Sequence, residues 1–99
     1  MNEQIHKLIE YSQKGILSKV VIKNEKFNIT LFCMAEGTGL SEHTSTKSGF
    51  VYVIEGNGVF NLEGKEIIMS TGVLIQMNEN AVHSLKAIEN TSFILVLTN

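Results

Sequence analysis

The sequence predicts an all-β fold, either a β-sandwich or a closed barrel. Short stretches of β-branched, aromatic and other apolar residues recur along its 99 residues. Turn signals built from glycine and asparagine separate these stretches at regular intervals, which is typical of such folds. We count about eight or nine strands of this kind. Proline, the other common turn residue, is absent.

The first segment of the chain is the least regular. Within residues 3–12, Ile5 and Leu8 fall on one stripe, which predicts either a short helix or an extended lead-in. Gly15 ends this segment. The β-branched residues that follow predict a first strand at residues 16–23.

Alternation and turn signals predict the later strands. Residues 27–35 alternate with period two, and Phe32 and Met34 fall on the face that begins polar, which we assign to the outside of the sheet. Glu63 and Gly64 signal a tight hairpin. The remaining strands are expected at residues 59–62, 65–69, 73–77, 82–88 and 92–97.

Composition and charge limit the classes of function. The chain has 43% hydrophobic and 18% charged residues, as expected for one globular domain over residues 1–99 with a barrel core at about 27–98. A net charge of −2 lacks the basic excess that nucleic acids require. No apolar run is longer than that of Phe93–Leu97, which is far shorter than the about 20 residues that cross a bilayer. The N-terminus does not read as a secretory signal and Cys33 is the single cysteine, so we expect a cytoplasmic protein without nucleic-acid or membrane partners.

Three histidines limit the acid–base and metal chemistry of the chain. His6 lies beside Lys7 on the polar side of the N-terminal stripe and is expected at the surface. His43 and His83 belong to two glycine-rich segments that we expect to bring both rings to one pocket. The sequence has no aspartate, and Ser45 does not stand in a Gly-x-Ser-x-Gly elbow, so a nucleophilic triad is disfavoured.

The segment from Gly37 to Gly56 resembles the first motif of the cupin family, whose members are small β-barrels of the jelly-roll type. That motif runs glycine, five residues, His-x-His, three or four residues, glutamate, six residues, glycine. This sequence keeps every interval. His43 takes the first histidine position, Ser45 stands in the second, and Gly49 stands in the position of the glutamate.

The segment from Gly72 to Ala87 resembles the second motif, which runs glycine, five residues, Pro-x-Gly, two residues, histidine, three residues, asparagine. Asn78 and Asn80 stand at the proline and glycine positions, and His83 keeps the histidine. Asn80 is the non-glycine residue best suited to a left-handed turn. The resemblance implies a jelly-roll β-barrel, or double-stranded β-helix, with both motifs at its interior.

The resemblance also implies a degenerate metal site. In metal-binding cupins the two histidines and the glutamate of the first motif hold a divalent metal together with the histidine of the second, and here only His43 and His83 remain. Catalytic metals usually keep three protein ligands. We therefore expect no tightly bound cofactor. At most, the site would hold a weakly bound divalent transition metal, such as zinc, iron, manganese, nickel or copper. Cys33 is the candidate third ligand, since soft sulfur with two imidazoles suits zinc or copper, although a lone cysteine on an apolar strand is more often a core residue.

A ligand pocket without a tightly held metal is the leading hypothesis. Strand alternation places His43, Ser45, Gly49 and Val51 on one face, and His83 is expected to join them. Serine and glycine in place of bulkier ligands enlarge the expected cavity, which would suit a small metabolite with one polar end. Because histidine is the side chain that titrates nearest neutral pH, a ligand bearing a carboxylate would be favoured as the pH falls.

Two other hypotheses stay open. One is an enzyme, either dioxygenase-like with His43, His83 and a non-standard third metal ligand, or isomerase-like with one of these histidines as general base. The other is a sensing module that acts through a partner protein. The sequence assigns no catalytic residue, and the cupin fold alone does not decide among these activities.

A homodimer is expected under each of these hypotheses. The argument is that Phe32, Met34, Phe50 and Ile54 fall on the faces opposite the pocket and would otherwise meet water.

Overall fold

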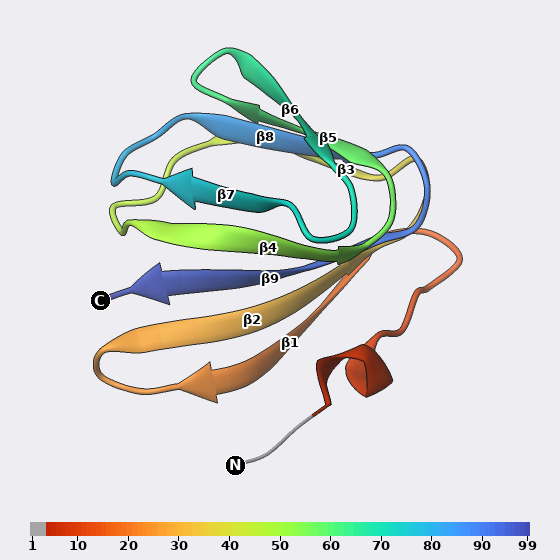
Figure 1. Ribbon diagram of the computed structural model, residues 1–99, viewed down its shortest axis with the longest axis horizontal. Helices are drawn as coiled ribbons and strands as arrows, with labels where there is room; N and C mark the ends of the chain where they lie inside the picture. The colour runs from red at the N-terminus through yellow and green to blue at the C-terminus, as the bar shows by residue number, and fades with distance from the viewer. Residues whose placement is uncertain (1–3) are drawn as a thin grey trace.

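The computed structural model describes residues 4–99, whose nine strands form two antiparallel sheets (Figure 1). The five-stranded sheet contains, in spatial order, β1 (Ile16–Lys23), β2 (Phe27–Met34), β9 (Thr91–Thr98), β4 (Gly49–Glu55) and β7 (Leu74–Met77). The four-stranded sheet contains β3 (Gly39–His43), β8 (His83–Ala87), β5 (Gly58–Leu62) and β6 (Lys65–Met69). From β2 to β5 and again from β6 to β9, successive strands alternate between the two sheets, and the predicted jelly-roll barrel is confirmed.

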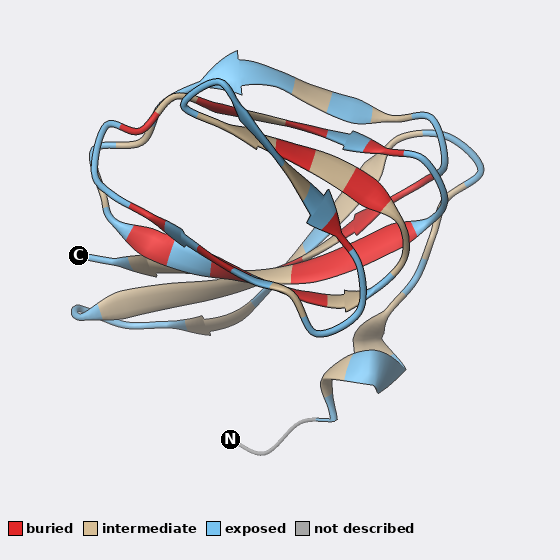
Figure 2. Ribbon diagram, turned by 45° about the horizontal axis from the view of Figure 1, so that its top comes forward, coloured by how far each residue is buried: buried red, intermediate tan, exposed pale blue. Residues whose placement is uncertain are grey.

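The hydrophobic core lies between the inner faces of the two sheets. Buried residues, red in Figure 2, recur along strands of both sheets. Val51 and Val53 of β4 and Phe93 of β9 meet Phe60 of β5 and Leu85 of β8 in one cluster. Since alternate residues of a strand share a face, a few inward positions per strand supply this core. Each large buried side chain contributes about 1.5–3 kcal/mol, so the cluster holds the two walls of the barrel together.

Two turns adopt the left-handed backbone that their residues predict. Glu63 and Gly64 have φ angles of 50° and 80° and connect β5 to β6, which confirms the hairpin signal. Asn80 has a φ angle of 64° in the loop before β8. Its backbone N–H donates to the carbonyl oxygen of Ser45 at 2.7 Å, so the loops beside the two motif histidines are tied to each other.

The faces of β2 are the reverse of the sequence-based assignment. Phe32 packs against the core cluster and stacks on Phe93 with ring centroids 5.2 Å apart, and Met34 is fully buried inside the barrel. Leu31 and Cys33 therefore lie on the outer face. The assignment of Phe32 and Met34 to the outside was wrong, because alternation shows which residues share a face but does not show which face meets the core.

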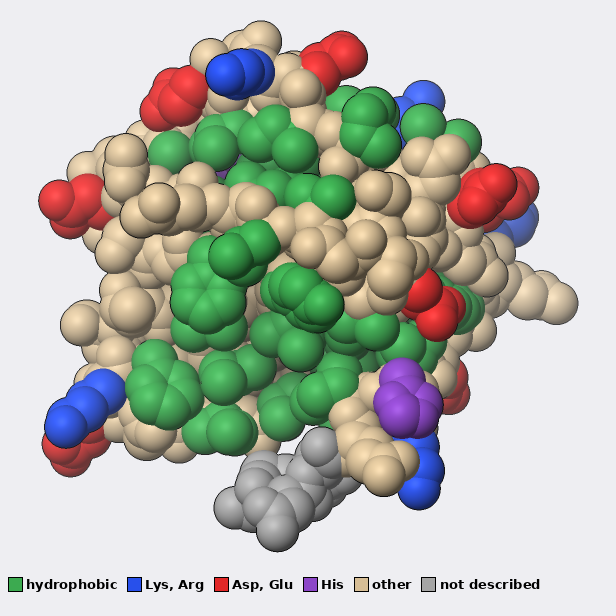
Figure 3. Space-filling model, viewed as in Figure 1, with side chains coloured by type: hydrophobic (Ala, Val, Ile, Leu, Met, Phe, Trp, Pro, Cys, Tyr) green, Lys and Arg blue, Asp and Glu red, His purple; other side chains and the backbone are tan. Residues whose placement is uncertain are grey.

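The outer face of the five-stranded sheet is apolar. Hydrophobic side chains gather over β2, β9 and β4, and most charged side chains lie at the margin of this area (Figure 3). Phe50, Tyr52 and Leu74 are exposed there. Ile54, near the end of β4, is half-buried.

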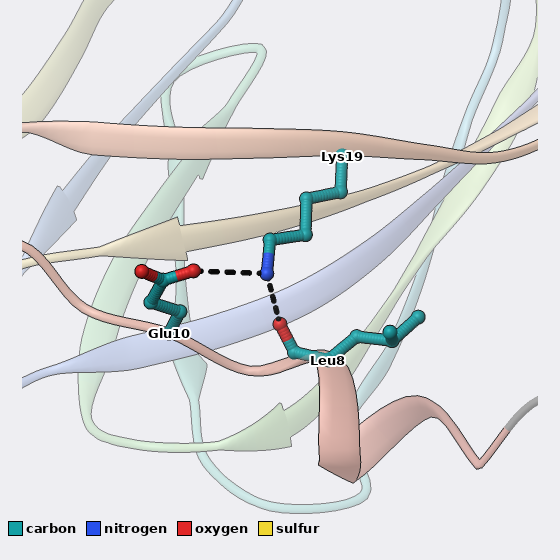
Figure 4. A network of polar contacts seen from close by, with 3 residues as sticks. All are labelled: Leu8, Glu10 and Lys19. Atoms are coloured by element: carbon teal, nitrogen blue, oxygen red, sulfur yellow. Dashed lines mark hydrogen bonds and ion pairs between the residues drawn. The ribbon is translucent and has the colours of Figure 1, made fainter.

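The N-terminal segment crosses the β1 side of this outer face. It begins with η1 (Ile5–Leu8), a single turn of 3-10 helix, and continues without regular structure. Lys19 is the cross-strand neighbour of Leu31, and its Nζ donates to the carbonyl oxygen of Leu8 at 2.9 Å and pairs with Glu10 at 3.1 Å (Figure 4). Of the two predicted forms, the short helix is present as this single turn within the described part of residues 3–12. Among residues 4–99, no helix has the length and hydropathy that a bilayer crossing requires.

A second contact ties this segment to the far side of the sheet. The hydroxyl of Tyr11 donates to the Glu55 carboxylate at 2.9 Å. Burial raises the pKa of Tyr11 to about 12, and the negative Glu55 adds to the rise. Leu31 and Cys33 are 0% and 1% exposed despite lying on the outer face, and the segment that passes over them accounts for this burial.

Candidate functional site

His43 and His83 face each other at one end of the β3–β8 ladder. His43 is the last residue of β3, His83 is the first residue of β8, and the two are direct cross-strand partners. Their ring centroids lie 4.1 Å apart and the ring planes meet at 60°. The structure therefore brings together the two histidines that lie forty positions apart in the sequence.

Both rings are oriented by the same backbone contact. Nδ1 of His43 lies 2.7 Å from the carbonyl oxygen of Ser41, and Nδ1 of His83 lies 2.9 Å from the carbonyl oxygen of Ala81. A carbonyl oxygen only accepts hydrogen bonds, so each Nδ1 carries the hydrogen. In the neutral rings Nε2 then holds a lone pair, and the pair of imidazoles presents two acceptors or metal ligands.

The two rings differ in burial. His83 is 7% exposed and stacks on Phe60, with ring centroids 5.8 Å apart and the planes nearly parallel at 3°. His43 is exposed. The pair thus lies at the mouth of the barrel, with one ring in the wall and the other in contact with solvent.

A cavity of about 60 Å³ opens beside the pair. Apart from the two imidazoles its walls are apolar, and no charged side chain lines it. The apolar lining residues are Phe32, Leu40, Val51, Phe60, Met77, Leu85, Phe93 and Leu95. A pocket for a drug-sized ligand measures about 300–1,000 Å³, so this cavity accepts a few waters or one end of a small molecule.

Ser45 forms hydrogen bonds within the loops and does not line the cavity. Its Oγ accepts from the backbone N–H of Lys47 at 3.1 Å, and its carbonyl oxygen accepts from Asn80. Ser45 is not among the lining residues. The structure therefore does not bring the Ser45 hydroxyl to the histidines, so Ser45 is not part of the pocket in which it was expected.

Packing against the neighbouring strand leaves no room for a side chain at Gly49. The backbone carbonyl oxygen of Val96, in the neighbouring strand β9, occupies the space where a Cβ atom on Gly49 would stand. Gly49 is buried but does not line the cavity. The expectation that glycine enlarges the pocket was wrong, because the approach of β9 fills the space that the missing side chain leaves.

Cys33 is not brought to the histidines either. It lies on the outer face of β2, whereas its neighbour Phe32 lines the cavity. No group of three or more His, Cys or Glu side chains within residues 4–99 is placed to hold a metal ion. A metal-bound histidine commonly donates its second ring nitrogen to a carbonyl, and His43 and His83 have that arrangement, but two ligands do not make the set of a tightly held metal. The residues present do not fit such a centre.

Several lining residues were missed by the sequence interpretation. Leu85 follows His83 by two positions on β8, so alternation alone could have placed it beside the inward ring. Leu40 could not be placed in this way, because the register of the β3–β8 pair shifts between Leu40 and His43. Phe32 was assigned to the opposite face of its strand.

Comparisons with known proteins agree with this geometry. Residues 30–98 match the cupin domain family. No curated protein matches the sequence significantly. Similar solved structures include a conserved protein of unknown function from Streptococcus pyogenes, with 20% identity, coverage of 100% of this chain and 87% of the other, and a TM-score of 0.89.

Two further structures are named as cupins. A cupin superfamily protein from Desulfitobacterium hafniense has 17% identity, coverage of 93% of this chain and 84% of the other, and a TM-score of 0.87. An RmlC-like cupin from Desulfovibrio desulfuricans has 18% identity, coverage of 99% and 95%, and a TM-score of 0.88. At these identities the structural likeness concerns the fold alone. With the family match over most of its length, the chain belongs to the cupin family.

Proposed function

We propose that the protein binds a small metabolite whose polar end enters the barrel beside His43 and His83. The observation that supports this most directly is the arrangement of the two rings. They stand 4.1 Å apart, each held by a carbonyl through Nδ1, at the mouth of an otherwise apolar cavity. Small-molecule sites typically combine apolar walls with a few oriented polar groups.

The ring nitrogens limit the chemistry of that polar end. In the neutral rings the two Nε2 atoms accept hydrogen bonds, which suits a ligand hydroxyl. When a ring is protonated its Nε2 becomes a donor, which suits a ligand carboxylate. A small metabolite that carries a hydroxyl or a carboxylate at one end matches both states.

The cavity size limits how the ligand is held. About 60 Å³ accepts the polar end and little more, so the rest of the ligand extends past the exposed His43 toward solvent. A divalent transition metal would find two imidazole ligands here and is expected to bind weakly.

The test is binding of short hydroxy acids and keto acids, followed by the NMR shifts of the histidine ring nitrogens. We expect saturable shifts at Nε2 of His43 and His83 and none at His6, which is exposed on η1 and serves as an internal control. His43→Ala should abolish binding, as should His83→Phe, which keeps an aromatic ring against Phe60. His6→Ala should bind as the wild type does. Absence of any shift across the panel, or full affinity in both site variants, would refute the proposal.

A further inference from the structure

The turn between β5 and β6 lies beside the loop that leads into His83. β5 and β8 are neighbours in the four-stranded sheet (Figure 1), and Leu62 and His83 form the pair at one end of their ladder. Glu63 follows directly after Leu62, so it is placed next to the residues that precede β8. Both its backbone and its side chain bond to that loop.

Glu63 holds Val82 by two hydrogen bonds. The Glu63 N–H donates to the carbonyl oxygen of Val82 at 2.8 Å. The Val82 N–H in turn donates to Oε1 of Glu63 at 3.2 Å. The first bond needs only the backbone, so any residue except proline could form it at this position. The second depends on the glutamate side chain, because its carboxylate is the acceptor.

The side-chain bond is linked to the contact that orients His83. The Val82 N–H and the Ala81 carbonyl belong to one peptide group, and that carbonyl oxygen accepts from Nδ1 of His83 at 2.9 Å. A chain of two hydrogen bonds thus runs from the Glu63 carboxylate through the Ala81–Val82 peptide to the imidazole. Charged acceptors form stronger hydrogen bonds than neutral ones, and linked hydrogen bonds polarise one another. The carboxylate therefore makes the Ala81 carbonyl a better acceptor for the His83 ring.

Glutamate is a costly residue at this position of the turn. Glu63 has a φ angle of 50°, and the following Gly64 has a φ angle of 80°. Glycine adopts such angles freely, whereas a residue with a Cβ atom is strained there. The backbone of the turn would be better served by glycine, which would lose the side-chain bond to Val82. The turn itself therefore gives no reason for a glutamate, whereas the link to His83 does.

We propose that Glu63 is a positioning residue for His83. Through the Ala81–Val82 peptide, its carboxylate holds the ring hydrogen of His83 on Nδ1 and keeps the Nε2 lone pair free. A histidine ring in water favours the opposite tautomer, and the hydrogen bond that one nitrogen makes decides which form is present. The consequence for a ligand rests on the proposed function, in which Nε2 of His83 accepts from a ligand hydroxyl.

His43 is oriented independently of Glu63. Its Nδ1 bonds to the Ser41 carbonyl on β3, and Glu63 forms no hydrogen bond to that peptide. The two rings should therefore respond differently to a change at Glu63, although their centroids lie 4.1 Å apart. A general loosening of the barrel mouth would instead affect both rings. His43 is thus the internal control.

The experiment measures the tautomer of each histidine ring in the ligand-free protein, from the ring ¹⁵N shifts at about pH 8.5, where imidazoles are ordinarily neutral. We expect the wild type to carry the hydrogen on Nδ1 of His83. Glu63→Gly removes the carboxylate but relieves the turn, so it should raise the fraction of the Nε2–H tautomer at His83 on the order of threefold without loss of stability. Glu63→Gln keeps an uncharged acceptor oxygen and should lie between the two. His43 should not change in either variant.

Glu66→Ala is the matched control. Glu66 is another exposed glutamate of the same hairpin and lies on β6, so this variant removes the same charge without touching Val82. It should leave both rings as in the wild type. Equal tautomer populations at His83 in the wild type and Glu63→Gly would overturn the proposal. An equal shift at His43, or the same shift in Glu66→Ala, would overturn it as well.

Ligand binding is measured separately, with the panel of hydroxy acids. An acid that binds the wild type should bind Glu63→Gly about tenfold more weakly, which is the scale of loss seen when the hydrogen-bond partner behind a ligating histidine is removed. A tautomer shift without binding of any acid to the wild type would refute the proposed function and leave the positioning role supported. Binding by the wild type with an unchanged His83 tautomer in Glu63→Gly would refute the positioning role alone.

Discussion

The carbonyl oxygen of Val96 occupies the position that a side chain on Gly49 would need. β4 and β9 are neighbours in the five-stranded sheet, and Gly49 and Val96 meet where β9 runs past the first residue of β4. The clash is with backbone rather than with a flexible side chain, so it cannot be relieved by a change of rotamer. In this chain the position of the first-motif glutamate is therefore closed to a carboxylate.

Gly49→Ala should destabilise the fold by about 1–3 kcal/mol, because β9 must shift to admit one methyl group. Urea unfolding followed by circular dichroism measures the change. Thr44→Ala, in the exposed part of the adjoining loop, is the control and should change stability by less than about 0.5 kcal/mol. Equal stability of the two variants would show that β9 does not constrain this position.

Metal retention should be poor. The protein loaded with Zn²⁺ or Ni²⁺ is expected to lose the metal on dialysis, because His43 and His83 supply two ligands where catalytic zinc sites keep three. Elemental analysis after dialysis measures the remaining metal, and His6→Ala removes the one other histidine as a source of binding. One equivalent retained by His6→Ala would contradict this expectation.

Asn80→Ala should cost about 1–2 kcal/mol, because Asn80 has a φ angle of 64° and alanine is strained in that region. Asn80→Gly should cost little, since glycine adopts this backbone freely. Chemical denaturation compares the two variants. The bond from the Asn80 N–H to the Ser45 carbonyl is a backbone contact that both variants retain, so a large loss with glycine would point to a role of the Asn80 side chain.

Stability at alkaline pH should depend on Tyr11. Its pKa is raised from 10.0 in the unfolded chain to about 12, mainly by burial, so its contribution is fully present below pH 10 and is lost as the pH rises through 12. The unfolding free energy of Tyr11→Phe should accordingly fall less steeply between pH 10 and 12 than that of the wild type. Identical slopes for the two proteins would exclude this contribution.

Local sequence predicted the parts of the structure that depend on local backbone preference. The hairpin at Glu63 and Gly64 and the left-handed turn at Asn80 were expected from residue type and are present. The spacing of the two motifs, through their resemblance to cupins, predicted that His43 lies beside His83. Strand alternation then placed Val51 in the pocket, because period two holds wherever a strand is regular.

The tertiary structure decided what depends on segments distant in the chain. Whether Phe32 or Leu31 faces the core follows from where the second sheet and the N-terminal segment lie, and alternation on β2 is the same in either case. The lack of space for a side chain at Gly49 is due to Val96 of β9, forty-seven residues later in the chain. No pattern within the motif of Gly49 shows that contact. Ser45 is held in the loop by hydrogen bonds from the backbone N–H groups of Lys47 and Asn80. The sequence thus determined the barrel and the histidine pair, whereas packing between distant strands determined how small the cavity beside them is.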